Sequence, residues 1–267
     1  MESLFSPPRS DQFKGVLWDN PSIILSITAL YLWFVLKFGP QWMENRKAYR
    51  LKPLTRLFNA CQVLANGWFT CNLTIIAVRN FPEGYFSFGC NPPTTVKPPA
   101  SNEEDIKMIG KLFTLYFYVR TVDYLDTVFF VLTKKQSHVS FLHVYHHVIV
   151  VVSSYIYLRS GWVPSIFHLS ILNASIHIIM YSYYFLSTFP ILRPYLWWKK
   201  YMTCMQILQF LFLTMQLSWA AMQDCGYPPL VNQYVAMQTT IFFVLFARFY
   251  FKNYKPSKGE TCARMTE

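Results

Sequence analysis

Three histidines near the start of one apolar stretch, His143, His146 and His147, are the residues of this sequence best suited to chemistry. The stretch, 139–158, has 20 residues and no Asp, Glu, Lys or Arg, so it is long enough to cross a bilayer as a helix. At about 100° per residue, the three imidazoles share one helical face about 100° wide. Imidazole can act as a nucleophile, a general base or a metal ligand. Because ionisable side chains inside a membrane usually face a bundle interior, the pattern predicts a functional site there.

Three other apolar stretches carry polar side chains at helical spacing, so that in each stretch these side chains share one face. They are Arg120, Asp123, Asp126 and Thr127 in 109–132, Asn173, His177, Tyr181 and Tyr184 in 163–187, and Gln206 and Gln209 in 199–222. From the alternating directions of the stretches, these groups and the histidines lie at similar depth, about 6–15 Å below one membrane surface. The opposite halves of the stretches are mostly apolar and aromatic. The sequence therefore predicts a pocket with a reactive polar mouth and a long apolar end.

The charged residues of 109–132 need partners, because a charge inside a bilayer costs roughly 2.5–3.5 kcal/mol on insertion scales. Arg120 and Asp123, at positions i and i+3, can offset each other. Asp126 has no cationic partner within its own helix. The histidines of the next stretch are the nearest candidates in sequence, because the two stretches form a hairpin with a short loop.

The composition predicts an all-α polytopic membrane protein, since 53% of the residues are hydrophobic and only 14% are charged. The net charge of +11 lies mainly in connections on one side of the membrane, which predicts no nucleic-acid partner, a lumenal N-terminus and a cytosolic C-terminus. We expect a single domain over 1–267, with 1–20 lumenal and 252–267 cytosolic. We expect seven transmembrane helices, at about 21–38, 57–79, 109–132, 139–158, 163–187, 199–222 and 231–251.

The motifs together resemble those of the very-long-chain fatty acid elongases of the endoplasmic reticulum, the ELO family of 3-ketoacyl-CoA synthases. The resemblance covers about 20–255 and rests on His143-x-x-His146-His147, His177-x-x-Met180-Tyr181 and Gln206-x-x-Gln209-Phe210. It implies condensation of a long-chain acyl-CoA with malonyl-CoA, in a narrow acyl tunnel within seven helices. One motif departs from the family, which usually has Lys-x-x-Glu-x-x-Asp-Thr where this chain has Arg120, Asp123, Asp126 and Thr127. Because Arg does not titrate, a proton-transfer role does not carry over to Arg120.

The resemblance also implies roles for single residues. It favours an acyl-enzyme on His146, with His177 as its closest partner and His143 as the alternative nucleophile; His143 and His147 would flank His146. Asp126 would accept a hydrogen bond from one box histidine and so fix its tautomer. The remaining polar residues would bind substrate: Arg120, Asp123, Thr127, Asn173, Tyr181, Tyr184, Gln206 and Gln209.

The resemblance further implies an endoplasmic reticulum membrane protein, whose expected partners beside membrane lipid are a second copy in a homodimer and other enzymes of the elongation cycle. We expect no cofactor and no metal at the histidines, because no cysteine lies near them and the only carboxylates within the apolar stretches are those of 109–132.

A disulfide between Cys90 and Cys225 is a further expectation, since loops of the family resemble this arrangement. Both residues lie in predicted lumenal connections, where oxidation is permitted. Intact-mass thiol labelling without reduction should therefore leave this pair unmodified, and labelling of both thiols would contradict the pairing.

Two other functional classes remain open at this point. Membrane di-iron desaturases and hydroxylases also use HxxHH boxes, but such sites need about eight histidines and this chain has six. A seven-helix receptor or transporter without chemistry is the other alternative. A measurement of bound iron tests the first, and malonyl-CoA-dependent product formation by the purified protein tests the second.

Overall fold

The structure is a computed structural model that describes residues 19–79, 103–160, 166–223 and 229–254 of the 267-residue chain. All regular elements in these ranges are helical, which confirms the all-α class. Cys90 and Cys225 lie outside the described residues, so the disulfide stays a prediction. The elements are α1 (Pro21–Trp33), η3 (Phe34–Phe38), α2 (Gly39–Met43), α3 (Lys52–Arg79), α4 (Glu103–Val122), α5 (Tyr124–Leu132), η5 (Gln136–His138), α6 (Phe141–Ser160), α7 (Phe167–Ser187), η7 (Pro190–Tyr195), α8 (Lys199–Met222) and α9 (Pro229–Tyr254).

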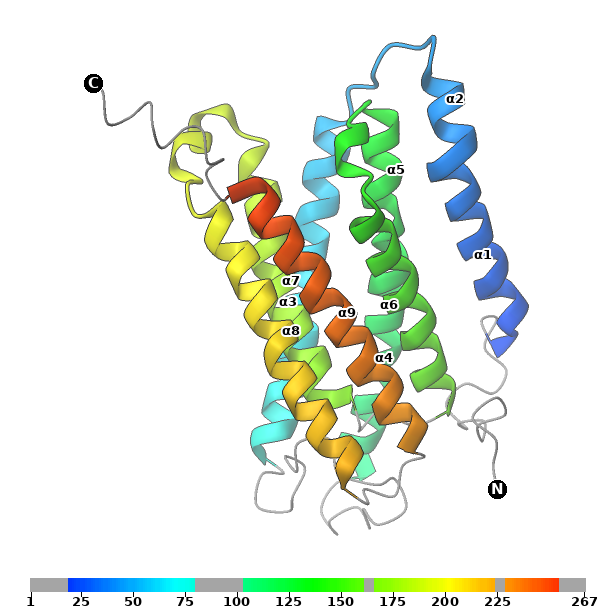
Figure 1. Ribbon diagram of the computed structural model, residues 1–267, viewed down its shortest axis with the longest axis vertical. Coiled ribbons are helices and arrows are strands. Elements are labelled where there is room, and N and C mark those ends of the chain that lie inside the picture. The colour runs from blue at the N-terminus through cyan, green and yellow to red at the C-terminus, as the bar shows by residue number, and fades with distance from the viewer. Residues whose placement is uncertain (1–18, 80–102, 161–165, 224–228, 255–267) are drawn as a thin grey trace.

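Six helical runs in the described ranges are long and apolar enough to span a membrane, so the chain is a multi-pass membrane protein. The predicted count of seven is not confirmed. The run formed by α4 and α5 does not meet the same measure, because acidic residues open α4 and Arg120, Asp123 and Asp126 follow farther along. These two helices nevertheless lie within the bundle beside α6 (Figure 1).

The predicted continuous helix over 109–132 is interrupted at Asp123, where α4 ends and α5 begins. At this interruption the backbone N–H of Asp126 donates a hydrogen bond to the carbonyl oxygen of Asp123, at 3.1 Å. The charged residues of this segment therefore sit at a helix junction.

Helix α1 stands at the edge of the bundle, as Figure 1 shows, and contacts it through buried polar and aromatic groups. The ring of Tyr31 stacks on that of Tyr124 in α5, with centroids 4.0 Å apart. The Tyr31 hydroxyl also lies 2.9 Å from Thr127 Oγ1. Farther along, Gly39 permits close contact with α5, because a Cβ there would lie 2.8 Å from Val131 Cγ1.

Most of the remaining contact is made by three pairs of helices, α8 with α9, α3 with α7, and α4 with α6. Helix α6 follows directly on the η5 turn, and Ser140 Oγ accepts a hydrogen bond from the backbone N–H of His143 at 3.2 Å. This is the bond of a helix N-cap, which satisfies an N–H that has no partner within the first turn. The three box histidines therefore occupy the first two turns of α6.

Candidate functional site

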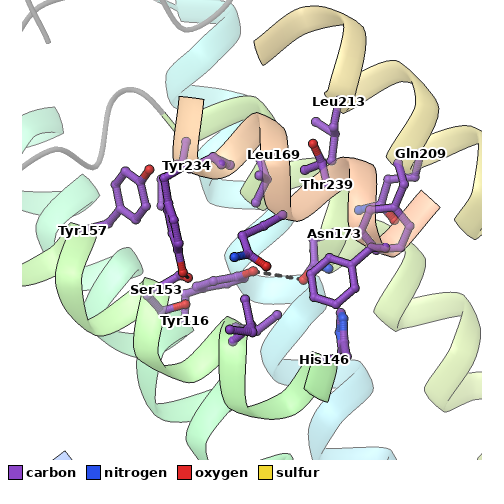
Figure 2. A pocket seen from close by; sticks show the side chains of 18 residues that line it. Tyr116, His146, Ser153, Tyr157, Leu169, Asn173, Gln209, Leu213, Tyr234 and Thr239 are labelled. Atoms are coloured by element: carbon purple, nitrogen blue, oxygen red, sulfur yellow. Dashed lines mark hydrogen bonds between the residues drawn. The ribbon is translucent and has the colours of Figure 1, made fainter. Parts of the chain in front are cut away.

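A small cavity of about 70 Å³ lies between α4, α6, α7, α8 and α9. Figure 2 shows His146 and Gln209 on one side of it and Tyr157 and Tyr234 on the other. A long apolar end was predicted for the pocket, but the part of this cavity farthest from His146 is not purely apolar. Ser153 Oγ and the Tyr234 hydroxyl lie there, 3.1 Å apart, and link α6 to α9.

His146 is the box histidine whose side chain lines this cavity. Three phenylalanines surround its imidazole, with ring centroids 5.0 Å away for Phe242 and 6.4 Å away for both Phe210 and Phe246. The ring of His177 lies parallel to it within 20°, at 6.3 Å. Within the part of the chain that the structure describes, the buried Nδ1 of His146 has no hydrogen-bond partner. None of the described residues therefore competes with a substrate for that nitrogen.

His143 and His147 do not line the cavity. His143 Nε2 lies 3.0 Å from Thr127 Oγ1, and its ring packs 5.4 Å from that of Phe130. The rings of His143 and His147 are 4.3 Å apart. The box thus divides into one imidazole at the cavity and an adjacent pair outside it, in which half-buried His143 contacts α5 and His147 is buried.

The tautomer of His177 follows from one hydrogen bond. Its Nδ1 lies 2.7 Å from the backbone carbonyl oxygen of Asn173, one turn earlier in α7. A carbonyl oxygen only accepts, so Nδ1 carries the hydrogen and donates it. In a neutral ring Nε2 then keeps its lone pair, which makes that nitrogen a base or a hydrogen-bond acceptor.

A buried polar network lies behind the cavity and is centred on Arg120, which is 1% exposed. Arg120 Nη1 pairs with Asp123 Oδ2 at 3.2 Å, which confirms the predicted i, i+3 ion pair. Arg120 Nη2 donates to Asn66 Oδ1 at 2.6 Å, and Nη1 lies 3.5 Å from Asn173 Oδ1. The Tyr116 hydroxyl donates to the same Asn173 oxygen at 2.9 Å. Because Asn173 and Tyr116 also line the cavity, the network reaches the cavity wall.

The predicted hydrogen bond from a box histidine to Asp126 is wrong. Asp126 Oδ2 instead lies 2.6 Å from the Tyr181 hydroxyl of α7. The neighbouring side chain, Thr127, takes the position beside His143, because consecutive residues of a helix point about 100° apart. Thr127 also contacts Tyr31, so it connects α1 and α6 to α5. It does not line the cavity.

Helix α3 contributes a polar face that was not predicted from the sequence. Asn59, Gln62 and Asn66 are buried there to within 3% exposure, and Asn66 reaches Arg120. Their spacing of three and four residues places them on one helical face of an apolar segment. That spacing is the same signal that singled out the other stretches, so it could have predicted them.

Of the eight predicted substrate-binding residues, Asn173 and Gln209 line the cavity and the other six do not. Tyr184 packs edge-on against Tyr181, with ring centroids 6.0 Å apart. Gln206 Nε2 lies 3.9 Å from Met180 Sδ. Tyr181 belongs to the buried network, whereas Gln209 does line the cavity and leaves its Nε2 without a partner among the described residues.

Imidazole is a common metal ligand, so the histidines are candidate ligands. Across the described ranges, no three His, Cys, Asp or Glu side chains are grouped closely enough to hold an ion. His138 lies outside the spanning helices, in η5, where partial burial lowers its pKa and the neighbouring Lys135 and Lys199 lower it further.

Comparison with known proteins gives a consistent result. Residues 16–261 match the family described as ELO, the GNS1/SUR4 family. The chain is 34% identical to "Very long chain fatty acid elongase 1" of Homo sapiens over 251 residues, covering 91% of this chain and 85% of that protein. It is also 34% identical to "Very long chain fatty acid elongase 2" of Mus musculus, over 97% of this chain and 86% of that protein. "Very long chain fatty acid elongase 4" of Homo sapiens is 34% identical over 92% of this chain and 76% of its own length.

Proposed function

We propose that this chain, which belongs to the ELO family and is a condensing enzyme of fatty-acid elongation, carries its acyl substrate on His146 as an acyl-imidazole. The overall reaction joins an acyl-CoA to malonyl-CoA and gives 3-ketoacyl-CoA, carbon dioxide and CoA. The observation that carries the proposal is that His146, alone of the box histidines, lines the cavity and has a buried nitrogen without a partner in the described structure.

The first half-reaction is acyl transfer to the imidazole. A nitrogen of neutral His146 attacks the thioester carbonyl, the carbon–sulfur bond breaks, and the imidazole proton neutralises the departing CoA thiolate. The Nε2 lone pair of His177, on the ring beside His146, can receive that proton on its way. The amide of Gln209, whose buried Nε2 has no partner among the described residues, can donate to the carbonyl oxygen as it becomes negative.

The second half-reaction consumes malonyl-CoA. Loss of carbon dioxide leaves an enolate, whose carbon attacks the acyl-imidazole carbonyl while the carbon–nitrogen bond breaks. The imidazole then takes up one proton and is ready for the next cycle. Over both halves one proton is consumed, one carbon–carbon bond forms, and no electrons are transferred to or from a cofactor.

Incubation with acyl-CoA alone tests this sequence. The purified protein should gain the mass of one acyl group, map it to a peptide containing 141–160, and lose it when malonyl-CoA is added. A protein that forms product only when both substrates are present, with no adduct at any time, would favour direct transfer between the two thioesters.

We also propose that no metal takes part in the reaction, because every step above is performed by imidazole and amide groups of the chain. A strong chelator followed by buffer exchange should change the condensation rate by less than about twofold. Loss of activity on chelation that one added metal ion restores would refute this proposal.

The remaining proposals concern the setting of the enzyme. We place it in the endoplasmic reticulum membrane as a single domain with a lumenal N-terminus and a cytosolic C-terminus, in accord with its family and with the Lys and Arg distribution. A homodimer and contacts with other enzymes of the elongation cycle are further proposals. Protease protection in sealed microsomes tests the orientation, and cross-linking in the same vesicles tests the assembly.

A further inference from the structure

We infer that Asp126 is a protonated, uncharged carboxylic acid in the resting enzyme and acts as a positioning residue that donates its proton to Tyr181. The Tyr181 oxygen lies 2.8 Å from Asp123 Oδ1 and 2.6 Å from Asp126 Oδ2, and all three side chains are buried. Both separations are those of O–H···O hydrogen bonds.

Counting hydrogens shows that this cluster needs a second proton. A tyrosine hydroxyl has one hydrogen to donate, and an ionised carboxylate has none. If both carboxyls were ionised, one of the two short oxygen–oxygen contacts would have no hydrogen between its atoms. In a buried site such a contact is repulsive, so one carboxyl must carry a proton.

The position of Arg120 decides which carboxyl that is. Its guanidinium, which is always charged, lies 3.2 Å from Asp123 Oδ2 and holds Asp123 as the anion. Within the described ranges no cationic side chain forms an ion pair with Asp126. The hydrogen bonds therefore run in one direction, from the Asp126 hydroxyl to the Tyr181 oxygen and from the Tyr181 hydroxyl to the Asp123 carboxylate.

This arrangement has a consequence for the cavity. With Asp126 uncharged, Arg120 and Asp123 balance, and the network carries no net charge. Asn173 belongs to both the network and the cavity wall, so the reaction takes place close to it. The reaction brings in the malonyl carboxylate and passes through an enolate, and an additional buried anion nearby would repel both. A protonated Asp126 avoids that repulsion and also fixes the Tyr181 hydroxyl, whose ring lies 6.0 Å from that of His177.

Infrared spectroscopy tests the protonation state without any turnover, so its outcome does not depend on which histidine carries the acyl group. The wild-type protein should show the carbonyl stretch of a protonated carboxylic acid, and Asp126→Asn should remove it. Asp105→Asn, which changes an aspartate paired with Arg79 at 3.1 Å, is the matched control and should leave the band in place. A band that survives Asp126→Asn, or a wild type without one, overturns the inference.

A second pair of measurements guards against an unstable variant. Tyr181→Phe removes the acceptor of the Asp126 proton, so the band should remain but shift to the frequency of a less strongly hydrogen-bonded acid. In the activity assay, Asp126→Ala should lower kcat at least about tenfold, and Asp126→Asn should recover most of that loss. The amide can replace the acid as a neutral donor to Tyr181, so Asp126→Asn as inactive as Asp126→Ala would count against the inference.

Discussion

Replacement of His146 by Ala should abolish both acyl-enzyme formation and condensation, while the protein extracted in detergent remains folded. The variant removes the proposed nucleophile but leaves the paired histidines, the Arg120 network and the Ser140 cap in place. Loss of a covalent nucleophile typically lowers turnover by several orders of magnitude, and we expect at least about a thousandfold here. The measurements are intact mass after incubation with acyl-CoA and product formation with malonyl-CoA.

Two other histidines provide the controls for this experiment. His138→Ala changes a histidine outside the spanning helices and should leave the adduct unchanged. His177→Ala keeps the nucleophile but removes its neighbour, so it should slow or stall the reaction with some adduct still formed. If an acyl adduct persists in His146→Ala on a peptide outside 141–160, another residue is the nucleophile; if it persists within that segment, His143 becomes the candidate.

Replacement of Arg120 by Met should cause the largest loss of stability of any single substitution in the network. The side chain is fully buried, and its removal leaves the Asp123 carboxylate without its cation and Asn66 without its donor. Breaking a buried ion pair from one side costs about 3–5 kcal/mol. For a chain of this size that corresponds to a fall in the apparent melting temperature of about 6–20 °C, measured in detergent.

Arg120→Lys is the informative control, since the family usually has Lys at this position. The ammonium can still pair with Asp123, but it lacks the fork of donors that reaches Asn66 and Asn173 at the same time. We therefore expect a melting temperature between those of the wild type and Arg120→Met. Equal melting temperatures for all three proteins would mean that the network contributes little to the fold.

Helical periodicity in apolar segments was sufficient to predict much of this protein. Six of the predicted spans match apolar helices long enough to cross a membrane, and His146, Asn173 and Gln209 line one cavity, with the ring of His177 6.3 Å from that of His146. The i, i+3 pairing of Arg120 with Asp123 was also predicted correctly, because a pair one turn apart in one helix is a local property of the sequence.

Contacts between helices were predicted less well, since they depend on how each helix is rotated about its axis. The partner of Asp126 is a clear case: it faces Tyr181 in α7, and Thr127, one residue later, faces the histidines. The interruption between α4 and α5 at Asp123 was not predicted either, because the apolar pattern of 109–132 continues through it. The polar face of α3 could have been found by the same periodicity, but without charged residues it was less conspicuous.

The phenylalanines around His146 also bear on the lifetime of the proposed intermediate. An acyl-imidazole is readily hydrolysed, so its usefulness depends on how rarely water reaches it compared with the second substrate. Phe210, Phe242 and Phe246 enclose the imidazole and offer water no hydrogen bond. On the proposed mechanism, we therefore expect the acyl-enzyme to persist while malonyl-CoA is scarce, so that hydrolysis of acyl-CoA is slow compared with condensation.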